Sequence, residues 1–256
     1  MRGQTMRELL RVESRWAEFA SWTADNLGDS QDAGYWLRQA LSMAREADDG
    51  TMATYILMRQ AQRAVEQRNA ARALALADGA TSSTGMAPRD RALCAIRSAE
   101  ASALAGQRVR CHSALQRAHT LVAAAEDPDD PDTIGRHCVP AYVVAHEGHC
   151  QLLLGQPEQA VTVLENVLRT WPAAYRQDEG LARTWLATAY AMLGRVDEAA
   201  EQGDHALTLA LDAGSVRLTR ALSRVDQQLA PHHGAPQAQR FRARYALAHQ
   251  VTGRMS

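Results

Sequence analysis

Residues 186–199 read LATAYAMLGRVDEA, which is the end of one helix, a tight turn and the start of the next helix. Gly194 stands at the turn, and the small residue Ala199 follows five positions later. The same arrangement recurs upstream, at turn positions 28, 67, 106 and 155. Successive turns are 39, 39, 49 and 39 residues apart. Repetition at this spacing predicts a stacked array of helix pairs, an architecture that commonly binds other molecules.

The copies follow the pattern to different degrees. The second has Gln67 at the turn and Arg72 followed by Ala73 at the small position, and the third has Cys111 as its small residue. The long step contains an insertion of 10 residues, for which the acidic, proline-containing segment 126–135 is the candidate. The two remaining copies follow the pattern fully, with Gly28 before Ala33 and Gly155 before Ala160.

The whole chain is predicted to be α-helical. Strong helix formers predominate, and runs of β-branched residues with a period of two are absent. We therefore expect an all-α fold, a right-handed superhelix of about five helix pairs with capping helices at the C-terminus. The predicted pairs are 6–27 with 30–48, 51–66 with 68–79, 88–105 with 108–126, 140–154 with 157–170, and 178–193 with 196–213.

Two further helices are predicted after the last pair. Ser215 can cap a helix over 216–229, whose Leu218, Leu222, Val225 and Leu229 form one apolar stripe suited to a terminal lid. The prolines of segment 231–236 interrupt the chain before a last helix over 237–250. Phe241 and Tyr245 lie on one face of that helix, which would pack back on the array or pair with another chain. We expect the array with its lid to span 1–230, and a linker with the last helix to span 231–256.

Composition narrows the classes of partner and compartment. The 256 residues carry a net charge of −1, so no global field favours nucleic acid or an anionic membrane. The four cysteines form no CxxC motif, which indicates reduced thiols. There is no apolar leader at the start, and no apolar run approaches the roughly 20 residues of a membrane span. We expect a cytoplasmic protein that does not contact membrane.

The small and aromatic positions of the last two copies resemble the tetratricopeptide repeat (TPR). In the fifth copy, Ala187 and Tyr190 match the first helix of that repeat, and Ala199 and Ala206 match the second helix. The fourth copy and the first also match, at Gly148, Gly155, Ala160 and Pro172, and at Gly28, Ala33, Leu37 and Ala40. The resemblance implies close helix packing at the small positions. The step of 39 residues implies longer helices than the usual repeat of 34.

Three segments carry a second resemblance, to the C-terminal sensor region of actinobacterial Xre-type regulators: Arg11–Trp22, Tyr55–Gln60 and Ala145–Cys150. Those regulators have a DNA-binding helix-turn-helix ahead of this region. Here the region begins within the first ten residues, so we expect no direct nucleic-acid binding by this chain. Related peptide-sensing regulators hold a short peptide in the groove of a similar array, which implies a groove ligand and a role in transcriptional regulation.

Two local clusters could be read as metal sites. His146 and Cys150 have the i, i+4 spacing that can hold zinc, and they resemble the HExxH motif with Cys150 in place of the second histidine. The alternative is a repeat helix on which Gly148 is a packing position. The acidic run 127–132 lacks the Gly and distal Glu of a calcium loop, and Cys111-His112 fits a helix start in the core. We expect neither a metal nor another cofactor.

The concave groove is the predicted binding site. In a stacked array the first helix of each pair lines the concave wall, and its side chains there combine apolar, aromatic and polar groups suited to a peptide. The alternative for each residue is a place in the core between repeats. The predicted groove residues are Glu18, Trp22, Met58, Arg59, Gln62, Arg97, Glu100, His146, His149, Thr184, Trp185 and Thr188.

These observations favour a non-enzymatic regulatory module that binds a peptide or a segment of a partner protein. The P-loop, the GxSxG motif and the dinucleotide GxGxxG motif are all lacking from the sequence, and no catalytic residue is predicted. Two alternatives remain: a scaffold or homodimeric assembly factor that uses Phe241 and Tyr245, and an enzyme that depends on a metal or a small molecule.

Overall fold

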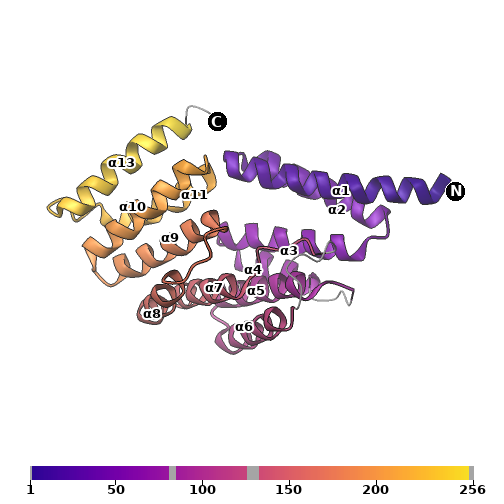
Figure 1. Ribbon diagram of the computed structural model, residues 1–256, viewed down its shortest axis with the longest axis horizontal. Helices are drawn as coiled ribbons and strands as arrows, with labels where there is room; N and C mark the ends of the chain where they lie inside the picture. Colours follow the sequence, from indigo (N-terminus) through magenta and orange to yellow (C-terminus); the bar gives the residue numbers. More distant parts are fainter. Residues whose placement is uncertain (1, 81–84, 126–132, 254–256) are drawn as a thin grey trace. The chain divides into compact units, whose positions relative to one another are not determined.

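The computed structural model describes residues 2–80, 85–125 and 133–253, and within these ranges every regular element is a helix. Consecutive helices joined by short turns pack against each other (Figure 1). The all-α prediction is confirmed. The helices are α1 (Arg2–Leu27), α2 (Ser30–Glu46), α3 (Gly50–Glu66), α4 (Ala70–Gly79), α5 (Pro88–Leu104), α6 (Arg108–Ala123), α7 (Pro140–Leu153), α8 (Pro157–Leu168), α9 (Arg176–Met192), α10 (Val196–Asp212), α11 (Val216–Ala221), α12 (Ser223–Leu229) and α13 (Pro236–Gly253).

The turns inside the pairs share one backbone geometry. At Gly106 the chain has φ +72°, and the N–H groups of Gly106 and Gln107 bond to the carbonyls of Ala103 and Ser102 at 3.0 and 2.8 Å. This is the Schellman arrangement, in which a residue in the left-handed region closes the end of a helix. Gly155 and Gly194 repeat it with φ +73° at both. The predicted turn glycines are confirmed at these positions.

The second pair turns one residue later than predicted. Arg68, not Gln67, has the positive φ of 56°, and Asn69 accepts from the backbone N–H of Arg72 as the cap of α4. Ala73, five positions after Arg68, is fully buried and is the small residue of this copy. The turn positions are therefore 28, 68, 106, 155 and 194, and the shift moves the groove register of α3 by one residue.

The chain divides into two compact units. Unit 1 comprises Met1–Ala24 and Ser30–Val143, and unit 2 comprises Asp25–Asp29 and Val144–Ser256. Each unit has its own set of buried residues. The predicted boundary at residue 230 stays a prediction.

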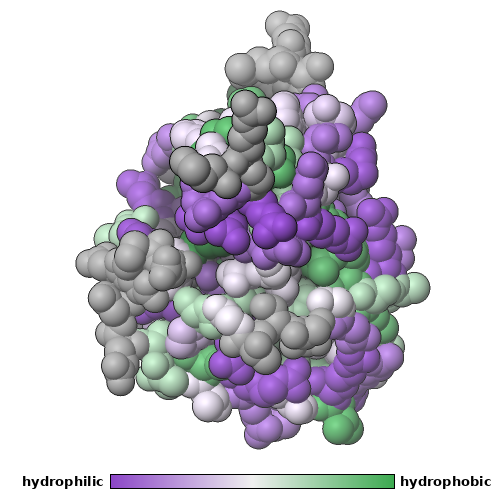
Figure 2. All heavy atoms as spheres, turned by 90° about the vertical axis from the view of Figure 1, so that its right-hand side faces the viewer, coloured by the Kyte–Doolittle hydropathy of each residue, from purple (hydrophilic) through white to green (hydrophobic). Residues whose placement is uncertain are grey.

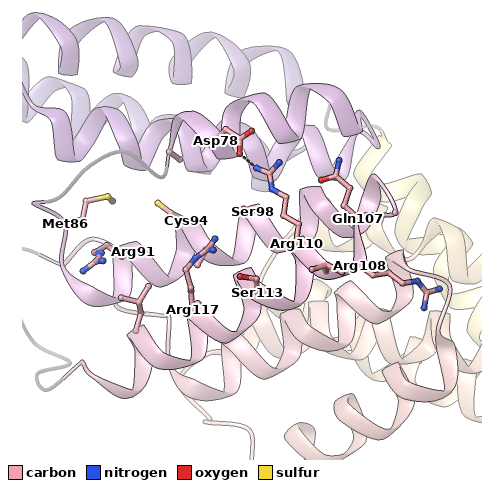
Figure 3. Close-up of a pocket in the computed structure, with 15 residues that line it drawn as sticks. Asp78, Met86, Arg91, Cys94, Ser98, Gln107, Arg108, Arg110, Ser113 and Arg117 are labelled. Carbon is pink, nitrogen blue, oxygen red and sulfur yellow. Dashed lines mark hydrogen bonds and ion pairs between the residues drawn. The ribbon is translucent and has the colours of Figure 1, made fainter.

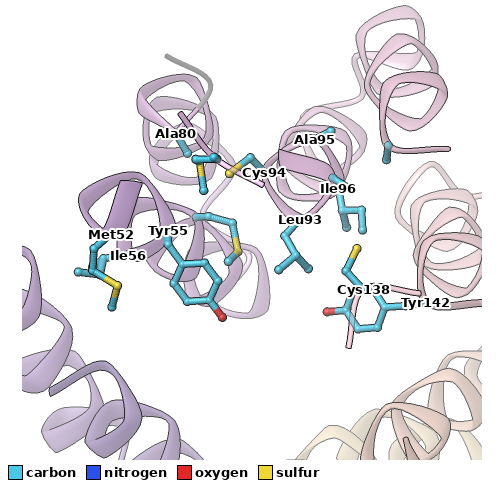
Figure 4. Packing of buried hydrophobic residues seen from close by; sticks show 14 of the residues in the cluster. Met52, Tyr55, Ile56, Ala80, Leu93, Cys94, Ala95, Ile96, Cys138 and Tyr142 are labelled. Carbon is cyan, nitrogen blue, oxygen red and sulfur yellow. The ribbon is translucent and has the colours of Figure 1, made fainter. Parts of the chain in front are cut away.

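Helix α5 is the centre of unit 1. It packs against α3, α4 and α6, and it is buried along nearly its whole length. Its many Ala and Ser residues let neighbouring helices approach from several sides. Figure 4 shows Leu93 of α5 between Tyr55 of α3 and Tyr142 of α7, all three of them in the buried cluster.

The start of α5 anchors the segment that precedes α7. The buried Asp90 carboxylate accepts from the backbone N–H groups of Ile134 and Gly135 at 3.2 and 2.6 Å. Arg89 donates to the carbonyl of Cys138 at 3.1 Å. The predicted insertion is described only from residue 133 onward. The acidic run 127–132 considered for calcium lies outside the described residues.

The predicted lid consists of two short helices instead of one, and both pack against α9, α10 and α13 in unit 2. Ser215 caps α11 by accepting from the N–H of Leu218 at 3.2 Å, as predicted. At Leu222 the N–H bonds to the carbonyl of Thr219, three residues back, and this tighter turn separates α11 from α12. The four stripe residues, Leu218, Leu222, Val225 and Leu229, are all buried.

The last helix, α13, packs back on unit 2. Phe241 is 1% exposed and lies against Gly203 of α10, where an added Cβ would come within 2.9 Å of its ring. Arg242 pairs with Asp226 of α12 at 2.9 Å. Tyr245 is buried as well. Of the two predicted alternatives for this helix, packing back on the array is therefore the one found, and the alternative that Phe241 and Tyr245 form an exposed face for another chain is wrong.

The surface mixes polar and apolar residues. On the face drawn in Figure 2 hydrophilic residues predominate, and hydrophobic ones form separate smaller areas between them. None of the helices in the described ranges is both long and apolar enough to cross a lipid bilayer.

Candidate binding site on the first helices

The corrected turns place equivalent residues of the first helices in two rows. One row lies nine positions before each turn and the other lies six, a spacing of three that puts both on one helix face. The resulting pairs are Phe19 with Trp22, Arg59 with Gln62, Arg97 with Glu100, His146 with His149, and Trp185 with Thr188.

Four of these five pairs make a direct side-chain contact. The rings of Phe19 and Trp22 stack with centroids 5.8 Å apart, and the rings of His146 and His149 are 6.4 Å apart. The pairs on α3 and α5 are polar. Arg59 donates a hydrogen bond to Gln62, and Arg97 donates one to Glu100.

In unit 1, Arg59 joins α1 to α3 through a polar chain that reaches the surface. Its guanidinium donates to Glu18 Oε1 at 2.9 Å and to Gln62 Oε1 at 2.8 Å. Gln62 in turn donates to the exposed Glu66 at 3.2 Å. The side chains of Arg59 and Glu18 are 10% and 13% exposed, so part of this chain of polar groups is open to a ligand.

The equivalent arginine of α5 is internal. Arg97 donates to Glu100 at 2.5 Å and to the Tyr142 hydroxyl at 2.6 Å, and both Arg97 and Glu100 are 2% exposed. Burial lowers the pKa of the Arg97 guanidinium, but Glu100 and Tyr142 outweigh it and hold the pKa above its usual value. The pair stays charged and ties α5 to α7 within unit 1.

Two tyrosines on the same face of the first helices were not among the residues predicted from the sequence. Tyr55 and Tyr142 each lie 13 positions before the turn of their copy, which the misplaced turn in the second copy concealed. Burial and then the Glu18 carboxylate raise the pKa of Tyr55 well above its usual value, with Arg59 opposing them. Tyr55 is therefore a neutral hydroxyl beside the Glu18–Arg59 pair.

Exposed aromatic rings continue the face of unit 1 along α1. Phe19 stacks on Trp22 and also meets Trp16 edge-on at 6.1 Å. Phe19 and Trp16 are exposed, and Trp22 is 37% exposed. Of the residues predicted from this unit, Glu18, Trp22, Arg59 and Gln62 thus offer accessible surface, whereas Met58 is buried together with Arg97 and Glu100.

In unit 2 the predicted residues form an aromatic cluster. His149 stacks on Trp185 with centroids 4.3 Å apart and planes 4° from parallel, and His146 meets the same indole edge-on at 4.9 Å. His146 is buried, and so is Cys150, the other candidate zinc ligand. The hydroxyls of Thr184 and Thr188 donate to carbonyls of their own helix at 2.8 Å.

Comparison with known proteins identifies structures of similar fold for this chain but no family. No protein-family model and no curated protein matches the sequence. A Rap protein complexed with Competence and Sporulation Factor has a TM-score of 0.63 and 15% identity, over 95% of this chain and 77% of that chain. Aspartyl phosphate phosphatase F from Bacillus subtilis has a TM-score of 0.56 and 15% identity, over 92% of this chain and 60% of that chain.

A further similar structure, of a single-substitution variant, contains TPR-like repeats of a putative kinesin light chain from Podosopora anserina. It has 16% identity and a TM-score of 0.48, over 81% of this chain and 97% of that chain. Identities this low show the fold alone. That fold is an all-α array of helix pairs, as the sequence predicted.

Proposed function

We propose that this chain is a non-enzymatic, cytoplasmic binding module that holds a peptide or a partner-protein segment on the concave faces of its first helices. The observation that carries the proposal lies in unit 1, where the partly open chain from Glu18 through Arg59 to Gln62 adjoins exposed Trp22. The resemblance of the sequence to sensor regions of Xre-type regulators supports a role in transcriptional regulation through a partner, without DNA contact by this chain.

A bound peptide would use both kinds of surface on this face. The amide of Gln62 can donate to and accept from a peptide backbone, and the ring of Trp22 offers apolar area to a side chain. Ordered polar groups beside apolar surface are typical of peptide grooves. The Rap protein of similar fold, which was solved with Competence and Sporulation Factor bound, supports a binding role for this architecture.

Peptide selection provides the test of this function. Panning a displayed heptapeptide library on the protein should enrich sequences that bind it, and the double variant Trp22→Ala/Gln62→Ala should weaken the best of them at least about tenfold, equivalent to 1.4 kcal/mol. Fluorescence anisotropy measures the affinity. Gln116→Ala, a substitution of an exposed residue of α6, is the matched control. Failure to enrich any peptide, or equal affinity for the double variant, would exclude this site.

A second candidate function, assembly as a homodimer, is supported by α1 and not by the C-terminal helix. Leu9, Val12, Trp16 and Phe19 lie on the solvent side of α1 and are 53%, 54%, 64% and 53% exposed. Their spacing of 3, 4 and 3 forms an apolar seam that is symmetric about residue 14. An antiparallel second copy would therefore place Leu9 opposite Phe19 and Val12 opposite Trp16, as a two-fold interface requires.

Light scattering tests this assembly directly. At a protein concentration of about 100 µM the wild type should exceed the monomer mass of 28.0 kDa, and Val12→Glu/Trp16→Glu should return it to that mass because buried carboxylates oppose pairing. Leu247→Glu, which changes an isolated exposed leucine of α13, should leave the mass as in the wild type. A wild-type protein that is monomeric throughout would refute the dimer.

A further inference from the structure

A hollow lies beside α5 in unit 1. Helix α4, whose last residues line the hollow, has 10 residues, whereas α2 and α6 have 17 and 16. The hollow measures about 1230 Å³. Cys94, Ala95 and Ser98 of α5 line it (Figure 3), together with residues from the end of α4 and along α6. None of the predicted groove residues lines this hollow.

The side chains around the hollow are strongly cationic. Four arginines line it, Arg91, Arg108, Arg110 and Arg117, and the one acidic residue of the lining, Asp78, pairs with Arg110. Within the part of the chain that the structure describes, the other three arginines have no ion-pair partner. The lining therefore has an excess of positive charge, which favours an anionic ligand.

Two of these arginines suit one anionic group. In Figure 3, Arg117 extends from α6 toward α5, and Arg91 lies near the first turn of α5. Both are exposed, so their guanidinium groups are free to rotate toward a bound carboxylate or phosphate. The start of α6, which has no side-chain cap, adds a partial positive charge farther along the lining.

The remaining lining is uncharged and partly apolar. Ala80, Met86 and Leu121 offer apolar surface beside the arginines. Burial is the main cause that raises the pKa of the Cys94 thiol to about 12, and the Asp90 carboxylate is the second. Cys94 is therefore a neutral thiol at physiological pH and adds no negative charge that would oppose an anion. The hollow offers an anion site next to an apolar wall.

We propose that this hollow is a second binding site, which takes a small organic anion whose carboxylate or phosphate group is held by Arg91 and Arg117. The apolar part of the molecule lies along Met86 and Leu121. A guanidinium group binds either a carboxylate or a phosphate in a bidentate manner, so the two chemistries are separated by experiment. The site is independent of the proposed peptide face, which is formed by α1 and α3.

Titration calorimetry with sodium octanoate, octyl phosphate and 1-octanol tests the proposal. At least one of the two anions should bind saturably with one site per chain, and the better anion identifies the preferred head group. Neutral 1-octanol should bind at least about tenfold more weakly, because it lacks the charge. Added salt should weaken the binding of the anion, since the arginines are exposed.

Arginine variants assign the site. Arg91→Gln/Arg117→Gln should raise the dissociation constant of the anion at least about tenfold, and Arg91→Lys/Arg117→Lys should recover part of the loss by restoring charge. The control Arg169→Gln/Arg240→Gln removes two exposed arginines of unit 2 and should change nothing. The proposal is overturned if neither anion binds saturably at about 1 mM, or if the Arg91→Gln/Arg117→Gln protein binds as the wild type does.

Discussion

Replacing Arg97 by alanine is expected to lower the free energy of unfolding by about 3–5 kcal/mol. The substitution would leave the Glu100 carboxylate buried without the guanidinium that now lies 2.5 Å away. It would also remove the donor to the Tyr142 hydroxyl, which joins α5 to α7. Removing one partner of a buried ion pair costs far more than the loss of an exposed ion pair, because the guanidinium no longer offsets the desolvation of the remaining carboxylate. Urea denaturation followed by circular dichroism measures the change.

The exposed pair of Arg195 and Glu198 provides a matched control. It has the same i, i+3 spacing, but its side chains are 43% and 44% exposed. Glu198→Ala should therefore lose less than about 1 kcal/mol. The double variant Arg97→Met/Glu100→Leu should recover most of the stability, since apolar residues of similar volume often replace a buried ion pair at little cost. A loss below about 1 kcal/mol for Arg97→Ala would show that the pair is solvated in the folded protein.

The helix boundaries were predictable because the turns carry a chemical signal. A residue in the left-handed region is usually glycine, so Gly106, Gly155 and Gly194 marked the helix ends to within a residue or two. Arg68 adopts the same conformation without being glycine, and composition offers no sign of this. Counting six positions back from Gln67 instead of Arg68 leads to buried Ala61, whereas Gln62 occupies that place in the row.

The burial of the candidate site residues was less predictable. Arg97 and Arg59 occupy equivalent places in their helices, yet Arg97 is enclosed while Arg59 has partial access to solvent. The difference depends on how many neighbours cover α5, which periodicity within a single helix does not reveal. The short length of α4, whose end lines the hollow beside α5, was visible in the predicted range 68–79, but its relation to the neighbouring helices was not.

Glycines inside helices held a signal for the packing of unit 2. Gly148 was predicted to be a packing position, and it does lie against Leu164 of α8. Gly203 stands inside α10 where the ring of Phe241 packs, and a glycine at such a place indicates the close approach of another element, here α13. The break at Leu222 had no such sign, because neither glycine nor proline stands near it.

Alanine substitutions at two helical glycines should change stability in opposite directions. Gly148→Ala is expected to lower the free energy of unfolding by about 1–3 kcal/mol, because the new Cβ would lie 2.6, 2.8 and 3.2 Å from three atoms of Leu164. Gly34→Ala in α2 meets only ordinary contacts, the nearest being the guanidinium of Arg38 at 3.5 Å. It should raise stability by about 0.5–1 kcal/mol through the better helix propensity of alanine.

The clash at Gly148 is expected to outweigh the gain in helix propensity that alanine brings, because Leu164 is fully buried. Close-packed interiors leave little room for such a side chain to shift. Leu164→Ala tests this cause. On its own it should destabilise by leaving a cavity, but combined with Gly148→Ala the loss should be smaller than the sum of the two single losses, since the new methyl group occupies space that Leu164 vacates. Urea denaturation of the four proteins yields the coupling energy, and strictly additive losses would show that Gly148 is retained for some reason other than the approach of α8 to α7.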